Sequence, residues 1–279
     1  MIPTAQIKAL EERVGAFPGD RRAMRQLVNA LETCNVHRSE LGVFGTAQLS
    51  LSRQTQDADW PLRMLDTTFA AQSYKFWIQD LVKRGITTAL PFAQAHCGQL
   101  HKIGGVPALC GIRLQMFAKE GVISGLCNSC YKVQILPQDL VSFFQTYFLL
   151  LSLELPDDNA RKCMIELRED VVSPYKGYIY CQSVEEAQAC KTALVQLMHK
   201  QGVGGVSVKI SHGCSEYGLQ YASFKYSEDP GAPTFAAPDD WEAREKAYFS
   251  GLTIPDQGRD HNNKIGISLR DVMVFHTWV

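Results

Sequence analysis

The chain has no excess of charge of either sign, because 28 lysines and arginines nearly balance 29 aspartates and glutamates. The net charge of −1 excludes the global positive field that many nucleic-acid-binding domains carry. Long apolar runs are also missing: the longest, 143–151, is interrupted by Gln145 and is far too short to span a bilayer. The first residues lack the apolar core of a secretory signal peptide. These absences predict a cytoplasmic protein without a membrane segment.

Catalytic signatures are missing as well. The sequence contains no Gly-x-Ser-x-Gly, no phosphate-binding loop and no dinucleotide-binding fingerprint. The acidic pairs at 157–158, 185–186 and 239–240 stand in predicted loops or at helix starts, where capping and solvation explain them. An enzyme therefore stays an alternative only, with a site near the cysteines or in the Gly-rich segment 98–111.

Hydrophobic residues make up 46% of the chain and charged residues 20%, which is typical of globular proteins with a core. The 279 residues are enough for two ordinary domains. We divide the sequence into a helical N-terminal region (1–125), an α+β domain (126–216) and a C-terminal extension packed on the rest (217–279).

Outside the central domain, the sequence mainly predicts helices. Apolar residues at three- and four-residue spacing predict them at 5–14, 21–33 and 66–83, and Asp20 is expected to cap the second. Ser268 is the expected cap of a last helix that ends at Trp278, with a strand as the alternative.

The central domain alternates strands and helices in the order βαββαβ. The predicted strands are 131–136, 163–168, 176–181 and 206–211, and the predicted helices are 138–153 and 184–200. Ser183 and Glu186 match a capping box at the start of the second helix. This order is that of the ferredoxin-like fold, in which the strands lie 4-1-3-2 and each is antiparallel to its neighbours. We therefore expect an α+β protein with a ferredoxin-like domain.

The hairpin of the second and third predicted strands is expected to turn about Val172. In that register Cys163 faces Cys181, and Ile165 faces Ile179. Alternation of side chains places these four residues on the face that the helices cover.

Nine cysteines, in a sequence without an export signal, are expected to be thiols or metal ligands rather than disulfides. Taken singly, Cys34, Cys110 and Cys190 fit small buried hydrophobes. His96, Cys97 and His101 form a second, weaker group of metal donors.

The predicted topology gathers further donors at one edge of the sheet, where two strands start and two end. The donors at this edge are Cys127, Cys130, Cys163, Cys181, His212 and Cys214. Zinc takes four tetrahedral thiolate or imidazole ligands, and Cys127-x-x-Cys130 resembles a zinc knuckle that supplies two. A second Cys-x-x-Cys is missing. The leading hypothesis is an accessory or interaction protein with structural zinc. An iron–sulfur cluster, a redox-active pair and buried thiols without metal are the alternatives.

The opposite face of the sheet suggests a second function. Lys176-Gly-Tyr178-Ile-Tyr180 resembles the third-strand signature of RNA-recognition motifs, Lys/Arg-Gly-aromatic-x-aromatic. The resemblance implies that Tyr178 and Tyr180 stack on bases of single-stranded RNA or DNA. Further cations that alternation or position assigns to this face, and that would contact phosphates, are Lys132, Arg168, Lys176 and Lys209.

The sequence departs from that motif in its first strand, which places Lys132 and Gln134 on the open face but no aromatic residue. The alternative is that the N-terminal helices or the C-terminal extension pack on this face, with the tyrosines as contacts. A protein partner or a single-stranded nucleic acid is therefore the expected partner, and no membrane is expected.

Overall fold

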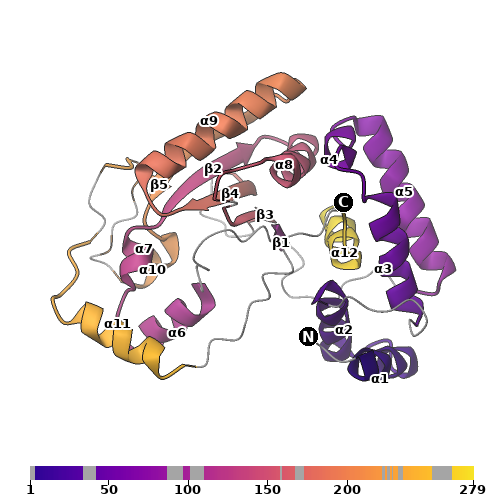
Figure 1. The fold of residues 1–279 in the computed structure, drawn as a ribbon, viewed down its shortest axis with the longest axis horizontal. Helices are drawn as coiled ribbons and strands as arrows, with labels where there is room; N and C mark the ends of the chain where they lie inside the picture. Colours follow the sequence, from indigo (N-terminus) through magenta and orange to yellow (C-terminus); the bar gives the residue numbers. More distant parts are fainter. Residues whose placement is uncertain are drawn as a thin grey trace.

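The protein is a mixed helix-and-sheet, α+β molecule, seen here in a computed structural model (Figure 1). The structure describes residues 4–33, 42–86, 97–100, 110–157, 159–166, 173–221, 224, 227, 229–231, 235–252 and 266–279. In these ranges, no helix has both the length and the apolar character that are needed to cross a membrane.

Helices outnumber strands among the described elements, and the strands fall in the middle of the chain. The elements are α1 (Thr4–Ala16), α2 (Arg21–Thr33), α3 (Val43–Gln54), α4 (Trp60–Arg63), α5 (Thr67–Lys83), β1 (Cys97–Leu100), α6 (Cys110–Glu120), α7 (Gly125–Asn128), β2 (Tyr131–Pro137), α8 (Leu140–Ser152), β3 (Arg161–Ile165), β4 (Tyr175–Cys181), α9 (Val184–Gln201), β5 (Val206–His212), α10 (Ser215–Gln220), α11 (Trp241–Ser250) and α12 (Leu269–Trp278).

The five strands form one sheet in the order β1-β3-β4-β2-β5, and every neighbouring pair is antiparallel. Four of them, with α8 and α9, follow the predicted chain order of strands and helices. The fifth strand, β1, pairs with β3 at the edge. It comes from the Gly-rich stretch, for which the sequence predicts no strand.

The predicted register of the β3–β4 hairpin is wrong. Cys163 faces Gly177 instead of Cys181, and Ile165 faces Tyr175 instead of Ile179. Alternation fixes which face a residue occupies, but registers that differ by an even number satisfy it equally well. The faces are therefore as predicted while the pairs are not.

Gly177 marks a close approach of α8 and β2 to β4. A Cβ atom added there would lie 3.1 Å from Thr146 Cγ2 on α8 and 3.2 Å from the Cβ of Ile135 on β2. A Cβ at this position would force its neighbours to move by a few tenths of an ångström, because α8 passes closely over the sheet here. The glycine thus lies under the helix, and Cys163 lies opposite it in the middle of β3.

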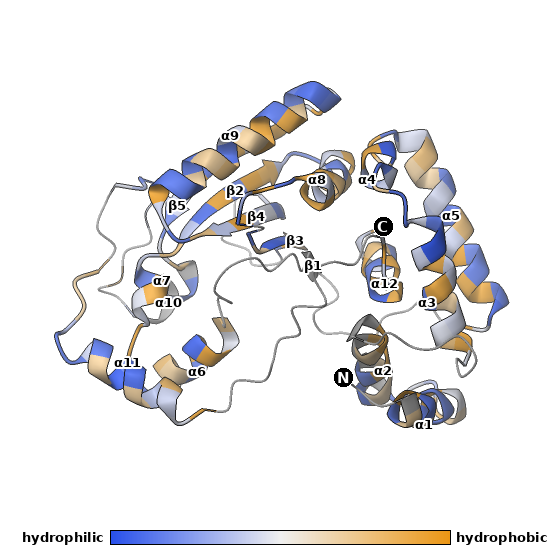
Figure 2. Ribbon diagram, viewed as in Figure 1, coloured by the Kyte–Doolittle hydropathy of each residue, from blue (hydrophilic) through white to orange (hydrophobic). Residues whose placement is uncertain are grey.

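Helices α8 and α9 cover one face of the sheet, and the N-terminal helices pack beside them (Figure 1). Helix α12 lies between β1 and the helices α2, α3 and α5. A single hydrophobic cluster runs through these elements, from Ile7 on α1 to Trp278 on α12. Accordingly, α8 is predominantly apolar in Figure 2, whereas the outer helix α9 is mixed.

Most of the predicted caps are confirmed. The Asp20 carboxylate accepts hydrogen bonds from the backbone N–H groups of Arg22 and Ala23. Ser183 caps α9 by accepting from the Glu186 N–H, although the Glu186 carboxylate accepts from Gln182 N–H rather than completing the box. Ser268 caps α12 in a full capping box, so the helical alternative for the end of the sequence is confirmed.

A second, smaller hydrophobic cluster lies beyond the β2–β5 side of the sheet, among α6, α7, α10 and α11 (Figure 1). Its buried residues are Met116, Val122, Ile123, Cys127, Tyr217, Phe224 and Trp241. Polar contacts tie these helices together: Arg113 on α6 forms an ion pair of 2.6 Å with Glu245 on α11, and both contact Ser124. The small cluster is thus held by aromatic packing and one buried polar network.

Candidate functional site

The face of the sheet that α8 and α9 leave uncovered carries the predicted nucleic-acid residues. In register, Tyr178 on β4 lies between Gln134 on β2 and Lys162 on β3. Lys209 on β5 lies on the other side of Gln134. These four side chains are half-buried, so they form a shallow polar row across four strands.

The two predicted tyrosines lie side by side. The ring centroids of Tyr178 and Tyr180 are 6.2 Å apart, with 31° between their planes. The ammonium of Lys162 lies 5.4 Å from the Tyr178 centroid and 5.8 Å from the Tyr180 centroid. Both distances are within the range of cation–π attraction, which holds the two rings and the lysine together.

The charge of the sheet differs from that of the whole chain. Four lysines alternate toward the open face, Lys132, Lys162, Lys176 and Lys209, and none of the five strands that the structure describes contains an aspartate or glutamate. The charged side chains that the described strands place on this face are thus all lysines, although Glu166 directly follows β3. Such a face attracts polyanions.

The Tyr180 end of the open face is covered. Lys132 is 7% exposed, and its ammonium donates a hydrogen bond to the carbonyl of Gly213 at 3.1 Å. Burial raises the pKa of Tyr180 well above its ordinary value, and the nearby thiols of Cys110 and Cys130 add to that rise. The accessible half of the face is therefore centred on Tyr178.

The predicted metal ligands fall into two groups on opposite sides of the sheet. Cys127, Cys130 and Cys214 gather between the start of β2, the end of β5 and the small hydrophobic cluster. The N–H of Gly213 donates to the carbonyl of Cys130 at 2.9 Å, and the Tyr217 hydroxyl contacts the Cys127 sulfur at 3.5 Å. These three cysteines are close neighbours, as the sequence predicts.

Cys163 and Cys181 do not join them. Cys163 has no exposed surface and lies in the main core, opposite Gly177, which is four residues along β4 from Cys181 at the predicted edge. Cys181 points to the helix side, where its thiol hydrogen-bonds that of Cys190 on α9. This contact raises the pKa of Cys181, and burial adds to the rise. The positions of the strand ends alone predict that all of the candidate cysteines lie at one edge of the sheet. The alternation of side chains along each strand instead directs Cys163 and Cys181 into the core.

The imidazole ring of His212 makes a stacking contact with Tyr131. The ring centroids are 4.2 Å apart, with 4° between the planes. All seven cysteines whose side chains are described are thiols. Within the described ranges, no group of three or more His, Cys, Asp or Glu side chains is arranged to hold a metal ion.

Some predicted residues lie outside the described parts of the chain. They are Arg168 of the nucleic-acid set, His96 and His101 of the second donor group, and residues 101–109 of the Gly-rich segment. No comparison supplies a function from elsewhere. No protein-family model, curated protein or solved structure matches this chain. The site must therefore be interpreted from its own chemistry.

Two residues of this region were missed by the sequence reasoning. Lys162 was missed because the predicted register began β3 at Cys163 and gave it no partner on β4. Cys110 was predicted to be a small buried residue, but the structure places it in an exposed position at the start of α6. Alternation alone could have placed Lys162 on the open face, since it precedes a residue that faces the core.

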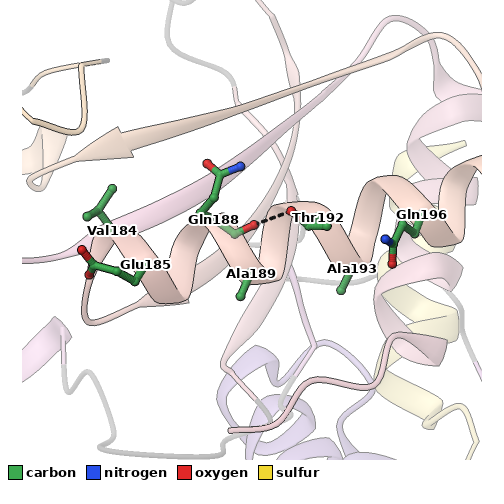
Figure 3. A pocket seen from close by; sticks show the side chains of 7 residues that line it. All are labelled: Val184, Glu185, Gln188, Ala189, Thr192, Ala193 and Gln196. Atoms are coloured by element: carbon green, nitrogen blue, oxygen red, sulfur yellow. Dashed lines mark hydrogen bonds between the residues drawn. The ribbon is translucent and has the colours of Figure 1, made fainter.

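A shallow hollow along α9 is the other surface feature, and Figure 3 shows its lining. All of the lining residues belong to this one helix: Val184, Glu185, Gln188, Ala189, Thr192, Ala193 and Gln196. The Thr192 hydroxyl donates to the helix's own backbone at Gln188, 2.8 Å away. The hollow is the flank of a helix with short side chains, and it gathers no set of chemical groups.

Proposed function

We propose that this protein binds single-stranded nucleic acid on the open face of its sheet. The observation that carries the proposal is the combination on one face of two adjacent tyrosines with four lysines and no acidic residue in the described strands. Aromatic rings stack on bases of any sequence, and lysines neutralise the phosphates that follow them.

We also infer that β2 to β5, with α8 and α9, form a ferredoxin-like unit to which β1 adds an edge strand. The order β5-β2-β4-β3 and the antiparallel neighbours support this inference. RNA-recognition motifs bind RNA on the open four-stranded sheet, through aromatic residues of the central strands. In this chain Tyr178 and Tyr180 stand on β4, which is one of the two central strands of the unit.

The contacts of the lysines indicate what each would do. Lys162 and Lys176 are half-buried beside Tyr178, and Lys209 is half-buried two strands away, across Gln134, so they are the expected phosphate contacts. Lys132 is buried against Gly213 and is expected to support the fold rather than the ligand. Gln134, beside Tyr178, offers both a donor and an acceptor to a base edge.

The cation–π contact of Lys162 prepares the aromatic pair for this role. A lysine above both rings keeps the rings from collapsing into different rotamers, because moving either ring loses the attraction. A nucleotide phosphate would attract the same ammonium, while the base would stack on the ring that the ammonium leaves. Specific recognition would come from few groups, so a weak preference for sequence is expected.

The test is fluorescence anisotropy of a labelled oligouridine and a labelled oligothymidine, measured with the full chain at several salt concentrations. Tyr178→Ala is expected to weaken binding roughly tenfold or more, because one base loses its stacking partner. The triple variant Lys162→Gln, Lys176→Gln and Lys209→Gln is expected to lower the salt dependence by about 0.7 in slope for each lost phosphate contact.

The matched control changes three lysines elsewhere, Lys119→Gln, Lys191→Gln and Lys200→Gln, which lie on α6 and α9. This control removes the same net charge. It therefore distinguishes the loss of lysines on the open face from a general effect of net charge on binding. Binding that is lost equally in both triple variants, or wild-type protein that does not bind either oligonucleotide at low salt, would refute the proposal.

A further inference from the structure

Strand β5 forms one edge of the sheet, so half of its backbone N–H and C=O groups point away from its neighbour β2. In an antiparallel pair, successive residues direct these groups alternately toward the neighbouring strand and away from it. The Gly213 N–H donates to the Cys130 carbonyl, and the Gly205 carbonyl accepts from Gln138 N–H, so the odd-numbered residues face β2. The residues that point outward are Val206, Val208, Ile210 and His212.

The outward groups of β5 differ in whether they are paired. His212 exchanges two hydrogen bonds with Ser227, of 2.9 and 3.2 Å, after which the chain turns away at 229–231. The outward N–H and C=O groups of Val206, Val208 and Ile210 have no hydrogen-bond partner in the part of the chain that the structure describes. A free edge of this kind is a template for the addition of another strand.

We propose that the free edge of β5, residues 206–210, binds the same edge of a second copy of the chain. A β-strand is the element that satisfies a row of alternate N–H and C=O groups. The free residues are symmetric about Val208, so an antiparallel copy can pair along their whole length. In this register Val208 faces the copy's Val208, and Val206 faces the copy's Ile210.

The side chains of β5 fit this register on both faces of the sheet. On the covered face, the cross-strand pairs are all apolar, and Val206 and Val208 are half-buried against the main core. On the open face, Lys209 faces the copy's Ser207, which is exposed. A register shifted by one position of the axis, to residue 209, would place Lys209 directly opposite itself, which is unfavourable. Charge and shape therefore favour an axis at Val208.

The ends of the free edge also match. The copy's chain reaches the Ser227 bridge with Gly204 and Gly205, which are both exposed. Gly205 has a φ of 69°, a left-handed conformation that turns the chain away from the strand direction. The copy's chain can thus leave the edge where Ser227 already occupies it. Pairing is limited to five residues on each side, so a weak and concentration-dependent dimer is expected.

The two-fold axis of such a strand pair is perpendicular to the sheet. The open faces of the two copies then point in the same direction and form one continuous surface, with Lys209 of each copy near the centre. The inference does not rest on the proposed nucleic-acid binding, because free backbone groups carry it. Dimerisation is therefore measured without nucleic acid.

The first test is sedimentation velocity of the reduced full chain, between about 1 µM and 1 mM, where weak complexes form. The wild type should change from monomer to dimer over this range. Val208→Pro should weaken the dimer at least tenfold, because Val208 meets itself and both central hydrogen bonds are lost. Proline is tolerated where a strand's N–H points outward. The control Val208→Thr keeps the N–H and the shape, so its affinity should stay within about threefold of the wild type.

The second test fixes the register by cross-linking. Val208→Cys should form a disulfide between two copies when glutathione disulfide oxidises the two thiols and is itself reduced to two glutathiones. The Cα atoms of such a pair lie about 5.5 Å apart, within the range of disulfides. Val206→Cys is the control on the same face, because four residues of strand separate it by roughly 13 Å from its own copy. Non-reducing electrophoresis and mass spectrometry of the joined peptides identify the bond.

A third measurement uses the wild-type chain alone. Amide exchange followed by NMR should become faster on dilution for Val206, Val208 and Ile210, while Ser207 and Lys209, whose N–H groups face β2, stay protected. A chain that remains monomeric, with rapid exchange at these three amides, would overturn the proposal and leave the edge to a strand of another protein. A dimer that persists in Val208→Pro, or that cross-links equally through Val206→Cys, would refute the pairing about Val208.

Discussion

The helix-covered face and the open face of the sheet are built from alternate residues of the same strands, yet they differ in chemistry. On the covered face, Val133, Ile135 and Ile179 have no exposed surface and belong to the main core. On the open face, their neighbours Gln134 and Tyr178 are polar and half-buried. One face therefore serves stability, and the other is available for binding.

Two adjacent cations show the same division. Arg161 is 2% exposed and donates hydrogen bonds to the carbonyls of Leu150 and Leu153 at the end of α8. Those carbonyls carry the partial negative charge of a helix C-terminus, which stabilises the guanidinium. Lys162, the next residue, lies above Tyr178 on the other face. The positive charge of Arg161 therefore stabilises the fold, whereas that of Lys162 lies on the face proposed for binding.

The largest effect is expected for a cavity in the covered face. Ile135→Ala should lower the free energy of unfolding by about 2 to 5 kcal/mol, because a fully buried side chain leaves a void under α8. Gln134→Ala, one residue earlier on the open face, should change it by no more than about 0.5 kcal/mol. Urea unfolding of both variants measures the difference, and equal losses would remove the distinction between the faces.

A smaller effect is expected for the two cations. Arg161→Met should cost roughly 2 to 3 kcal/mol, since buried carbonyls at the end of α8 lose their donor. Lys162→Met keeps an apolar stem over the tyrosines and should cost less than about 0.5 kcal/mol. Thermal and urea unfolding can compare them. A loss in Lys162→Met as large as that in Arg161→Met would be contrary to the assigned roles.

The smallest effect is expected at Gly177. Gly177→Ala should lower the free energy of unfolding by roughly 1 kcal/mol, because the added Cβ crowds Thr146 and Ile135. The reduced entropy of the unfolded chain offsets part of this cost. Gly204→Ala is the control, since a Cβ there meets nothing within 4 Å and the backbone needs no left-handed conformation. It should be neutral or slightly stabilising in the same unfolding experiment. Stabilisation by Gly177→Ala would argue against the close approach of α8.

Periodicity made much of the fold predictable. Hydrophobic residues recur about every 3.6 positions in helices and every 2 positions in strands, and this pattern is present in the local sequence. It predicts the helices at 5–14, 21–33 and 66–83 and the βαββαβ order. The strand β1 could not be predicted, because Cys97-Gly-Gln-Leu100 is too short to show a pattern and acquires its structure by pairing with β3. The hairpin register could not be predicted either, because alternation is satisfied equally well by registers that differ by an even number.

The candidate site was predictable in part for the same reason. Alternation placed Tyr178 and Tyr180 on one face, and this needs no knowledge of the register. Lys162 required the correct start of β3 at Arg161. The packing of α6 beside α7 and α10 is encoded by no local pattern. Cys163 was predicted to lie at the metal-binding edge because it stands at the start of a predicted strand. Its location depends instead on the face of the sheet toward which its side chain points.

The position of α12 has a consequence for how the chain reaches its native state. The N–H of Ile267, just before α12, bonds to the hydroxyl of Thr55, across a separation of 212 residues, and the Leu269 N–H bonds to Gln48. During synthesis the apolar sides of α2, α3 and α5 cannot be fully buried until α12 has been synthesised, because α12 packs between these helices and β1. Contacts of such long range slow folding and leave hydrophobic surface open meanwhile. The N-terminal helices are therefore expected to depend on chaperones during translation more than the sheet does.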